Sequence, residues 1–572
     1  MKNQLLENHM SDYRLLPIGV EDYKEIITNK NTYIDKTLLI KEFWQDGGKV
    51  ILTPRPRRFG KTLNLSMLKY FFEKTDHNTS NLFKKTNIWA DPEYRALQGQ
   101  FPVIFLTFKN IKADSWELAY IKFANFLTIN VEKLLSPIFT SLTPVEQNWY
   151  KRLVDRNATE ADYTDSLFYA TVILERYHQK KVIVLIDEYD APIIYAHLHN
   201  YYEKMINFMN DLLSTVLKTN SALQKGFLTG ITRIAKEGIF SGLNHLSVFT
   251  VLDAEYSDKF GFTQNEVDQL LISYDLVDKK NDIKNWYDGY IFGQINIYNP
   301  WSLINCIKKR GEFETYWVNT SNNDLIRSLI ASSSQAVKND IELLLQKKEI
   351  ADKEIDKNIS LRDIKNNDKA LWSLFLFTGY LTATSRTMID DKYHYTLTLP
   401  NKEIVLLYRE LITEALNNTL LSGKITELFT AFMTGDQYKL ETLLQEFVVN
   451  SCSSFDLPIN DLERSVHMFV LGMLVGLSNR YIIRSNRESG HGRYDIMLTP
   501  RLPQDPGILI EFKKTKNKKE LAGSAQKTLE QIKNKSYVTE MRSSDYHGPI
   551  FCYGIAVVPG KYVAVTMEIV KN

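Results

Sequence analysis

Long hydrophobic runs are missing from this sequence of 572 residues. Its longest apolar stretch, 469–477, is about half as long as a bilayer-spanning helix, which takes roughly 20 residues. The opening residues 1–10 are polar and lack the apolar segment of a secretory leader. We therefore expect a cytoplasmic protein with no membrane partner.

Cysteine and net charge are also scarce. The three cysteines, Cys306, Cys452 and Cys552, lie far apart, which gives neither the spacing of a metal site nor an even set for disulfides. This usage fits a reducing compartment. The 70 Lys and Arg residues nearly balance the 68 Asp and Glu residues, so any affinity for nucleic acid must come from a local basic patch.

The length of the chain predicts more than one domain. Residues 12–290 alternate apolar runs with helical patterns, which predicts an α/β domain with a parallel sheet. In 291–455 the pattern is mainly helical. Within it, 371–400 suggests helix, strand, strand and helix, as in a winged-helix-like module. Such a module would either contact nucleic acid or a protein partner, or serve as a structural lid or interdomain spacer. Residues 456–572 return to an α/β pattern.

A phosphate-binding loop is predicted at residues 49–62. The apolar run 50–53 indicates a buried strand, and Gly60, Lys61 and Thr62 then open a helical pattern. Backbone N–H groups at a helix start bind phosphate, a lysine reaches the outer phosphates and a threonine hydroxyl binds Mg²⁺. Arg55 stands where the usual pattern has its leading glycine.

A second apolar run, 182–186, ends in Asp187 and Glu188. Such a strand delivers its first carboxylate to the Mg²⁺ shell of a P-loop site, and the neighbouring carboxylate can polarise the attacking water. Together with the loop, this pair predicts nucleotide binding. Further strands are expected at 101–108, 226–232 and 248–252, which makes about five in all.

Ligands bind at the carboxyl ends of parallel strands, which makes Thr229, Thr232 and Arg233 candidate phosphate sensors. For Arg233 a solvated loop position is the alternative. Earlier in the chain, Asp35 and Thr37 either cap a helix or contact the base or ribose.

Several motifs of the first half resemble the AAA-ATPase-like family of bacterial proteins. They are Leu-Pro-Ile-Gly at 16–19, Tyr-Ile-Asp-Lys-Thr at 33–37, Arg-Pro-Arg-Arg-Phe-Gly-Lys-Thr at 55–62, 185–192, 229–236, 240–244 and 286–290. The resemblance implies a P-loop ATPase of the ASCE class, with ATP and Mg²⁺ as cofactors. It also implies that arginine at the start of the loop belongs to the family. Proteins of this class often assemble, so a homo-oligomer is compatible with it.

The loop arginines Arg55, Arg57 and Arg58 put dense positive charge beside the phosphates. Three roles are open for them: binding phosphate, contacting the nucleotide of a neighbouring subunit, or pairing with Asp190 and Glu188.

The last part of the chain predicts a helix at 463–478, a strand at 481–485, a polar turn at 486–492 and a hairpin formed by 493–498 and 508–513. Glu511 and Lys513, two residues apart in a strand, share a face, and Asp495 on the neighbouring strand can converge on them. Carboxylates that hold Mg²⁺ beside a lysine suit phosphodiester hydrolysis.

These residues resemble the PD-(D/E)XK nuclease superfamily, in the branch often fused to such ATPases. The resemblance implies that Glu463, Asp495 and Glu511 are metal ligands and that Lys513 positions the nucleophile; Gln531 matches a glutamine often found after the core strands. In the surrounding stretch, residues 480–540 hold thirteen Lys and Arg against seven Asp and Glu. This patch is either a phosphate-binding surface or an ordinary solvated face.

The two resemblances together predict an ATP-dependent or ATP-regulated nuclease that acts on nucleic acid, with DNA favoured over RNA. The alternative is a signalling or scaffolding switch driven by ATP, whose last domain only binds nucleic acid or a partner.

Overall fold

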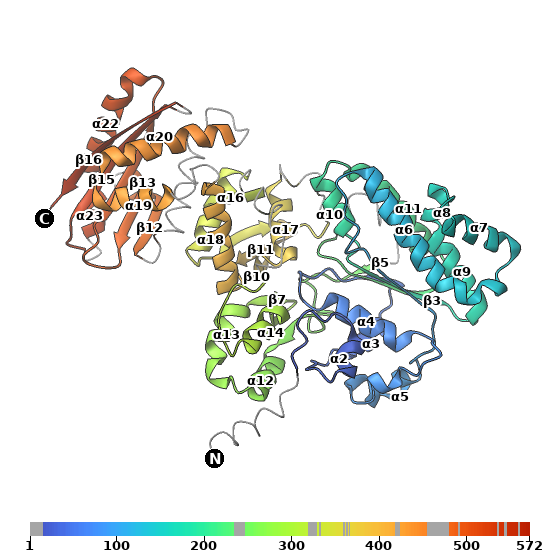
Figure 1. The fold of residues 1–572 in the computed structure, drawn as a ribbon. Helices are drawn as coiled ribbons and strands as arrows, with labels where there is room; N and C mark the ends of the chain where they lie inside the picture. The colour runs from blue at the N-terminus through green and yellow to red at the C-terminus, as the bar shows by residue number, and fades with distance from the viewer. Residues whose placement is uncertain are drawn as a thin grey trace, which may run out of the picture. The chain divides into compact units, whose positions relative to one another are not determined.

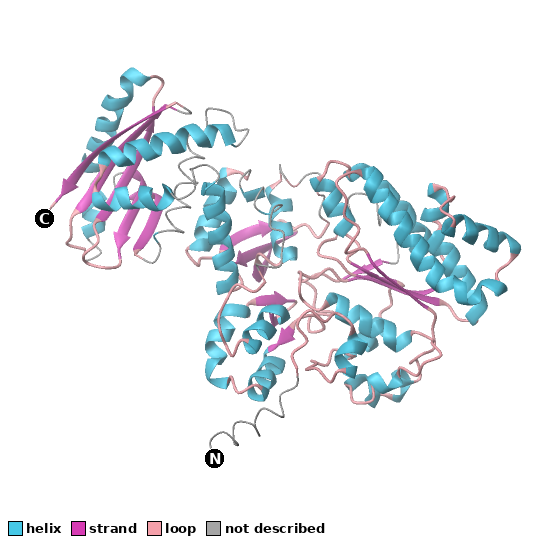
Figure 2. Ribbon diagram, in the orientation of Figure 1, coloured by secondary structure: helices cyan, strands magenta, loops and turns pink. Residues whose placement is uncertain are grey.

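The computed structural model divides into two compact units, each described here by itself: Met1–Ser321 with Ala351–Ile404, and Asn322–Ile350 with Val405–Asn572. Figures 1 and 2 show the elements of each. The described residues are 15–233, 246–317, 326, 329–330, 333–358, 361, 364, 367–417, 424–454, 477, 480–489, 492–534, 537–542, 546–558 and 561–571. Within these ranges no helix has the length and apolar character needed to cross a membrane. The domain limits at 290 and 455 stay predictions.

The first unit is built on a parallel sheet of five strands in the order β2-β3-β4-β1-β5, as the sequence predicts. Helix α4 lies below the sheet in Figure 1, and α6, α9 and α11 lie above it. Strands covered on both faces must be apolar throughout, and every residue of β1 and β3 is buried. The strands are β1 (Val50–Leu52), β2 (Val103–Thr107), β3 (Val182–Asp187), β4 (Leu223–Leu228) and β5 (Leu246–Val248).

The helices of this part mostly follow the predicted alternation with strands. Their starts show the expected caps: Thr143 forms a capping box with Glu146 at the start of α7, and Ser115 caps α6. The helices are α2 (Tyr23–Thr28), α3 (Leu38–Gln45), α4 (Lys61–Phe72), α5 (Pro92–Arg95), α6 (Trp116–Leu135), α7 (Pro144–Val154), α8 (Glu160–Thr164), α9 (Ser166–His178), α10 (Ala191–Leu198) and α11 (Tyr202–Leu217).

Two of the predicted strands have wrong limits. The strand expected at 248–252 ends at Val248, because the backbone N–H and the hydroxyl of Thr250 both donate to Asp253 Oδ2 at 2.8 Å and start a turn. The strand expected at 226–232 runs over Leu223–Leu228, so that Thr229–Thr232 lie in a loop at its carboxyl end.

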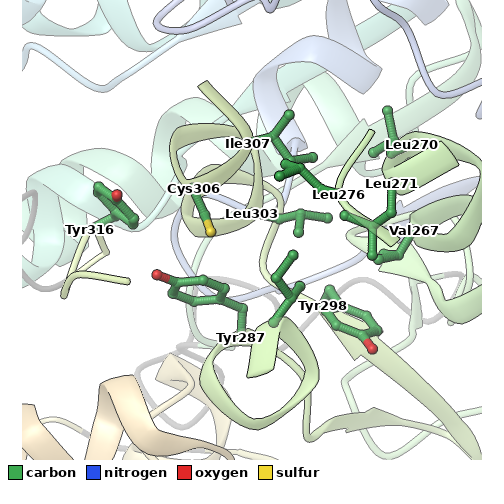
Figure 3. Packing of buried hydrophobic residues seen from close by; sticks show 11 residues of the cluster. Val267, Leu270, Leu271, Leu276, Tyr287, Tyr298, Leu303, Cys306, Ile307 and Tyr316 are labelled. Carbon is green, nitrogen blue, oxygen red and sulfur yellow. The ribbon is translucent and has the colours of Figure 1, made fainter. Parts of the chain in front are cut away.

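A small helical subdomain follows the sheet within the first unit. Its core, shown in Figure 3, brings together side chains of α12 (Gln264–Ser273), α13 (Lys280–Tyr287) and α14 (Pro300–Lys308). A three-stranded sheet, β6 (Phe262–Thr263), β8 (Ile295–Tyr298) and β7 (Tyr290–Phe292), accompanies these helices.

The predicted order of helix, strand, strand and helix in the middle region is confirmed. The elements are α17 (Asp368–Thr378), β10 (Thr382–Ile389), β11 (Lys392–Thr398) and α18 (Lys402–Asn417), with β9 (Ile350–Glu354) as a third strand. Helix α16 (Gln335–Leu345) belongs to the second unit, and α18 begins in the first unit and continues into the second.

The second unit contains a mixed sheet of five strands in the order β12-β13-β14-β15-β16. The predicted hairpin is the antiparallel pair β13–β14, but the turn expected at 486–492 is shorter, because β12 continues to Ser489 and β13 starts at Gly492. The remaining pairs are β14–β15, which is parallel, and β15–β16, which is antiparallel. The strands are β12 (Tyr481–Ser489), β13 (Gly492–Pro500), β14 (Gly507–Lys514), β15 (Ile550–Val558) and β16 (Tyr562–Val570), and the helices are α19 (Lys424–Thr434), α20 (Gln437–Ser454), α22 (Leu521–Asn534) and α23 (Tyr537–Arg542).

Candidate nucleotide and phosphodiester sites

The loop between β1 and α4 has the geometry of a phosphate-binding loop. Gly60 has φ of 82°, in the left-handed region that strains any side-chain-bearing residue, and α4 starts at the next residue. The amino group of Lys61 is buried inside the loop, where it donates to the carbonyls of Arg55 at 3.1 Å and Pro56 at 2.9 Å. Burial lowers the pKa of Lys61, and nearby carboxylates oppose this shift. A helix start and a buried lysine thus converge on one point.

Thr62 and Asp187, the predicted Mg²⁺ ligands of this loop, lie together. The hydroxyl of Thr62 donates to Asp187 Oδ2 at 2.7 Å, and Thr107 approaches the same oxygen at 3.5 Å. Asp187 Oδ1 is buried and has no hydrogen-bond partner among the described residues. Burial raises the pKa of Asp187 to about 6, partly opposed by the bond from Thr62. A hydroxyl and a carboxylate with an unused oxygen form a donor set that fits Mg²⁺.

The residues after Asp187 hold the predicted sensor loop in place. Asp190 Oδ2 accepts from the backbone N–H groups of Ile231 and Thr232, both at 2.8 Å. The hydroxyl of Tyr189 donates to the carbonyl of Thr232 at 2.8 Å. A Cβ on Gly230 would lie 2.4 Å from Asp190 Oδ1, so the contact needs a glycine there.

The sensor loop is also bonded to the phosphate-binding loop. The hydroxyl of Thr229 donates to the carbonyl of Thr53 at 3.1 Å, and Gly230 accepts from the backbone N–H of Arg55 at 3.0 Å. Thr229 therefore lies beside the phosphate-binding loop, and its role as a phosphate sensor stays a prediction. Arg233 is half-buried rather than fully solvated, and burial lowers the pKa of its guanidinium.

Glu188, the predicted base, is partly buried and has φ of 49°. A non-glycine residue in the left-handed region is uncommon and marks a constrained backbone. Its charge acts on both Lys61 and Asp187. The structure thus brings Glu188 to the same edge of the sheet as the loop.

Arg55 has a role that the sequence did not suggest. It is fully buried, and its guanidinium donates to the carbonyls of Pro54 at 2.9 Å, Phe249 at 2.7 Å and Tyr256 at 3.2 Å. Burial lowers the pKa of Arg55 to about 10. None of the three roles considered for the loop arginines describes these contacts, since Arg55 fixes the loop to the segment that follows β5.

Arg58 has a different environment from Arg55. Its guanidinium lies 4.3 Å from the centre of the Trp301 ring and 3.9 Å from Glu21 Oε1. Glu21 also accepts from Lys109, at 2.8 Å. Sequence reasoning missed Glu21 and Lys109, although Lys109 follows β2 at the carboxyl edge of the sheet, the same rule that identified Asp187.

Arg57 contacts the rest of the first unit through its backbone carbonyl. The side chain is partly buried, and the carbonyl accepts from the indole N–H of Trp317 at 3.1 Å.

Asp35 and Thr37 form a local turn. Asp35 Oδ1 accepts from the N–H of Thr37 at 2.9 Å and from its hydroxyl at 2.6 Å, and Asp35 Oδ2 accepts from the N–H of Asn87 at 2.7 Å. Both carboxylate oxygens of Asp35 are used in this turn, and Thr37, the residue before α3, makes no side-chain capping bond to the helix.

The second candidate site lies on the central strand β14. Glu511 is 5% exposed and pairs in register with Gly554 of β15, while Lys513 is exposed. A Cβ on Gly554 would point at Leu529 of α22, and paired residues share a face, so Glu511 and Lys513 lie on the face that α22 covers. Ile510 pairs with Ile496, which puts the strand position of Asp495 next to that of Glu511.

Several predicted features lie outside the described residues or side chains. They are Glu463 with all but Leu477 of its predicted helix at 463–478, the motif at 240–244, and the side chain of Asp495. Gln531 lies on α22, as predicted. In the described part of the chain, no three His, Cys, Asp or Glu side chains gather as a metal site. The predicted carboxylate cluster at Glu511 stays a prediction.

Comparison with known proteins gives two family matches. Residues 17–240 match a family model described as a predicted AAA-ATPase, and residues 461–567 match the PD-(D/E)XK nuclease superfamily. A curated relative, an uncharacterized protein in the vnfD 5' region of Azotobacter chroococcum mcd 1, is 26% identical over 541 residues, which cover 92% of this chain and 94% of that protein.

A solved structure of Drosophila ORC bound to AT-rich DNA and Cdc6 is also similar, at 11% identity. It covers 68% of this chain and 91% of that chain with a TM-score of 0.18, which is too low to support a conclusion. The two family matches agree with the fold of the parallel sheet and of the C-terminal mixed sheet described above. The chain therefore combines an AAA-ATPase-like domain at residues 17–240 with a PD-(D/E)XK nuclease superfamily domain at residues 461–567.

Proposed function

We propose that this protein binds and hydrolyses ATP in its first unit and thereby controls Mg²⁺-dependent cleavage of nucleic acid, DNA rather than RNA, by its C-terminal domain. The observation that carries the proposal is the bond between Thr62 and Asp187 beside the buried Lys61. This arrangement offers a cation to the phosphates and an oxygen pair to Mg²⁺ at one edge of the sheet.

Each residue of the nucleotide site has a proposed task. The N–H groups after Gly60 bind phosphate oxygens, and Lys61 exchanges its carbonyl partners for the outer phosphates. Glu188 accepts a proton from the attacking water. The remaining proposed phosphate contacts are Arg57, Arg58, Thr229 and Arg233. Bound Mg²⁺, held by Thr62 and Asp187, would neutralise charge on the phosphates.

In the C-terminal domain, Glu511 and Asp495 with Glu463 are the proposed metal ligands. Lys513, exposed at the end of β14, is proposed to orient the attacking water or a phosphate oxygen. The basic stretch 480–540 supports the choice of a polyanionic substrate.

The test of the nucleotide site is the Glu188→Gln substitution. We expect ATP affinity to stay within about threefold of wild type while turnover falls by about 10² or more, since only proton transfer is removed. Glu93→Gln, an exposed carboxylate on α5, is the matched control and should change neither quantity. Unchanged turnover in Glu188→Gln would reject the assignment, and absence of ATP binding by wild type would reject the function.

A non-cleaving ATP switch is the second candidate, and the burial of Glu511 favours it, because a catalytic metal ligand must face a site that substrate can enter. The two candidates differ in what Lys513→Ala does. If wild type cleaves DNA with Mg²⁺ and Lys513→Ala does not, the nuclease is supported. If wild type binds DNA but does not cleave it in any nucleotide state, the switch is supported.

A further inference from the structure

Trp317 contacts the phosphate-binding loop from 260 positions away in the sequence. Its indole N–H donates to the carbonyl of Arg57 at 3.1 Å, and its ring is buried against Tyr380 at 5.3 Å between centroids. An indole nitrogen can only donate a hydrogen bond. This bond therefore forms only when the Arg57 carbonyl points toward the indole of Trp317.

Glu403 fixes the backbone of the same tryptophan. It is fully buried, and its Oε1 accepts from the backbone N–H of Trp317 at 2.6 Å while its Oε2 accepts from the hydroxyl of Ser302 at 2.8 Å. A buried carboxylate without donors is costly, so these two bonds hold Glu403 in one place. Trp317 is therefore anchored at its backbone and bonded to the loop at its side chain.

The position of these two residues along the chain is significant. The segments of the first unit end at Ser321 and at Ile404, where the chain passes to the second unit. Trp317 comes four residues before the first of these points and Glu403 one residue before the other. The bond between Trp317 and Glu403 therefore ties together two of the chain's connections to the unit that holds the C-terminal sheet.

The loop end of this chain of bonds is positioned to respond to phosphate. Lys61 donates to the carbonyls of Arg55 and Pro56, directly before Arg57, and Arg58 after it has φ of 68°. A phosphate that takes Lys61 as a partner removes two bonds that orient these peptide groups. The Arg57 carbonyl belongs to the peptide group that directly follows these two, so a change in their orientation reaches it through the backbone.

We propose that Trp317 and Glu403 are positioning residues that transmit the state of the phosphate-binding loop to helix α18 and to both connections. The proposal rests on the proposed ATP binding by the first unit. It requires no contact between the two units, because α18 itself continues from the first into the second.

Hydrogen–deuterium exchange of the full chain, with and without a non-hydrolysable ATP analogue and Mg²⁺, tests the proposal. In wild type we expect the analogue to change exchange in peptides from both 50–65 and 402–417, since exchange reports local opening. Trp317→Phe keeps an aromatic ring at this position, although a smaller one, and removes the N–H donor. It should retain the response at 50–65 and lose at least half of the response at 402–417.

Trp372→Phe is the matched control, because Trp372 is also buried in the first unit and should leave both responses intact. The proposal is overturned if Trp317→Phe shows the same change in exchange at 402–417 as wild type. It is also overturned if the analogue changes exchange in wild type only at 50–65. If Trp317→Phe does not fold, Glu403→Met, which is similar in length and removes both acceptors, gives the same comparison. Absence of any response at 50–65 in wild type overturns the proposed ATP binding itself.

Discussion

At the scale of single residues, the nucleotide site is a set of buried charges that the fold holds at a cost. Asp187 lies at the end of an apolar strand, bonded to Thr62 through one oxygen, and burial raises its pKa to about 6. Lys61 is likewise buried, with a lowered pKa. Both groups would gain from a ligand of opposite charge, which is what a Mg²⁺–nucleotide complex supplies.

The raised pKa of Asp187 predicts a pH-dependent stability. Unfolded, this carboxyl titrates near 3.9, so between about pH 4 and pH 6 the folded protein binds a proton that the unfolded chain does not, and stability falls as pH rises through this window. Asp187→Asn should therefore raise the free energy of unfolding at pH 7 by up to about 3 kcal/mol, with little gain at pH 4. Urea denaturation without nucleotide or metal measures both values.

Asp76→Asn, an exposed carboxyl, is the control and should show no such pH-dependent gain. An equal effect of Asp187→Asn at pH 4 and pH 7 would show that the carboxylate is not destabilised by burial.

Residue roles were predictable where a motif fixes the chemistry and unpredictable where packing decides it. Gly60, Lys61 and Thr62 occupy the expected loop because the strand, turn and helix are adjacent in sequence. The role of Arg55 depends on carbonyls at Phe249 and beyond, some 200 positions away. No local pattern encodes such a contact.

At the scale of elements, helix α22 and strand β15 determine how the C-terminal site is covered. A Cβ on Gly554 would lie 2.3 Å from the carbonyl oxygen of Ala525 and 2.6 Å from the nitrogen of Leu529, so the helix backbone rests directly on the strand. The close approach happens beside Glu511, the in-register partner of Gly554. The glycine therefore sets the depth of the helix over the candidate site.

Gly554→Ala should force α22 away from the sheet and destabilise the second unit by about 1–3 kcal/mol, the usual cost of overpacking. Gly523→Ala is the control on the same helix: a Cβ there meets nothing within 4 Å, and replacing a helical glycine should stabilise by about 0.5–1 kcal/mol. Thermal melts of both variants give the comparison. A neutral Gly554→Ala would mean that the helix does not pack as closely as described.

The approximate positions of strands with strong apolar runs were predictable from the sequence, but the residues at which those strands end were not. Every strand of the parallel sheet was expected near its observed place, but β5 stops at Val248 because of the Thr250–Asp253 turn, a side-chain effect that hydrophobicity does not report. The three-stranded sheet β6-β8-β7 was missed because its strands have two to four residues each, too few for periodicity to show.

At the scale of the whole molecule, the chain links an AAA-ATPase-like domain and a PD-(D/E)XK superfamily domain through a middle region shared between the two compact units. Helix α18 belongs to both units, so a change at its start in the first unit is connected covalently to the second. This continuity is the physical basis for expecting ATP to control the C-terminal site.

The most direct test of this account is Mg²⁺-dependent cleavage of labelled single- and double-stranded DNA by the full chain, measured with no nucleotide, with ATP and with a non-hydrolysable analogue. We predict a cleavage rate that depends on nucleotide in wild type, that no longer depends on it in Lys61→Ala, and that is lost in Lys513→Ala while ATP turnover persists. A rate that is the same in every nucleotide state and unchanged by Lys61→Ala would contradict the claim that the first unit controls the last domain.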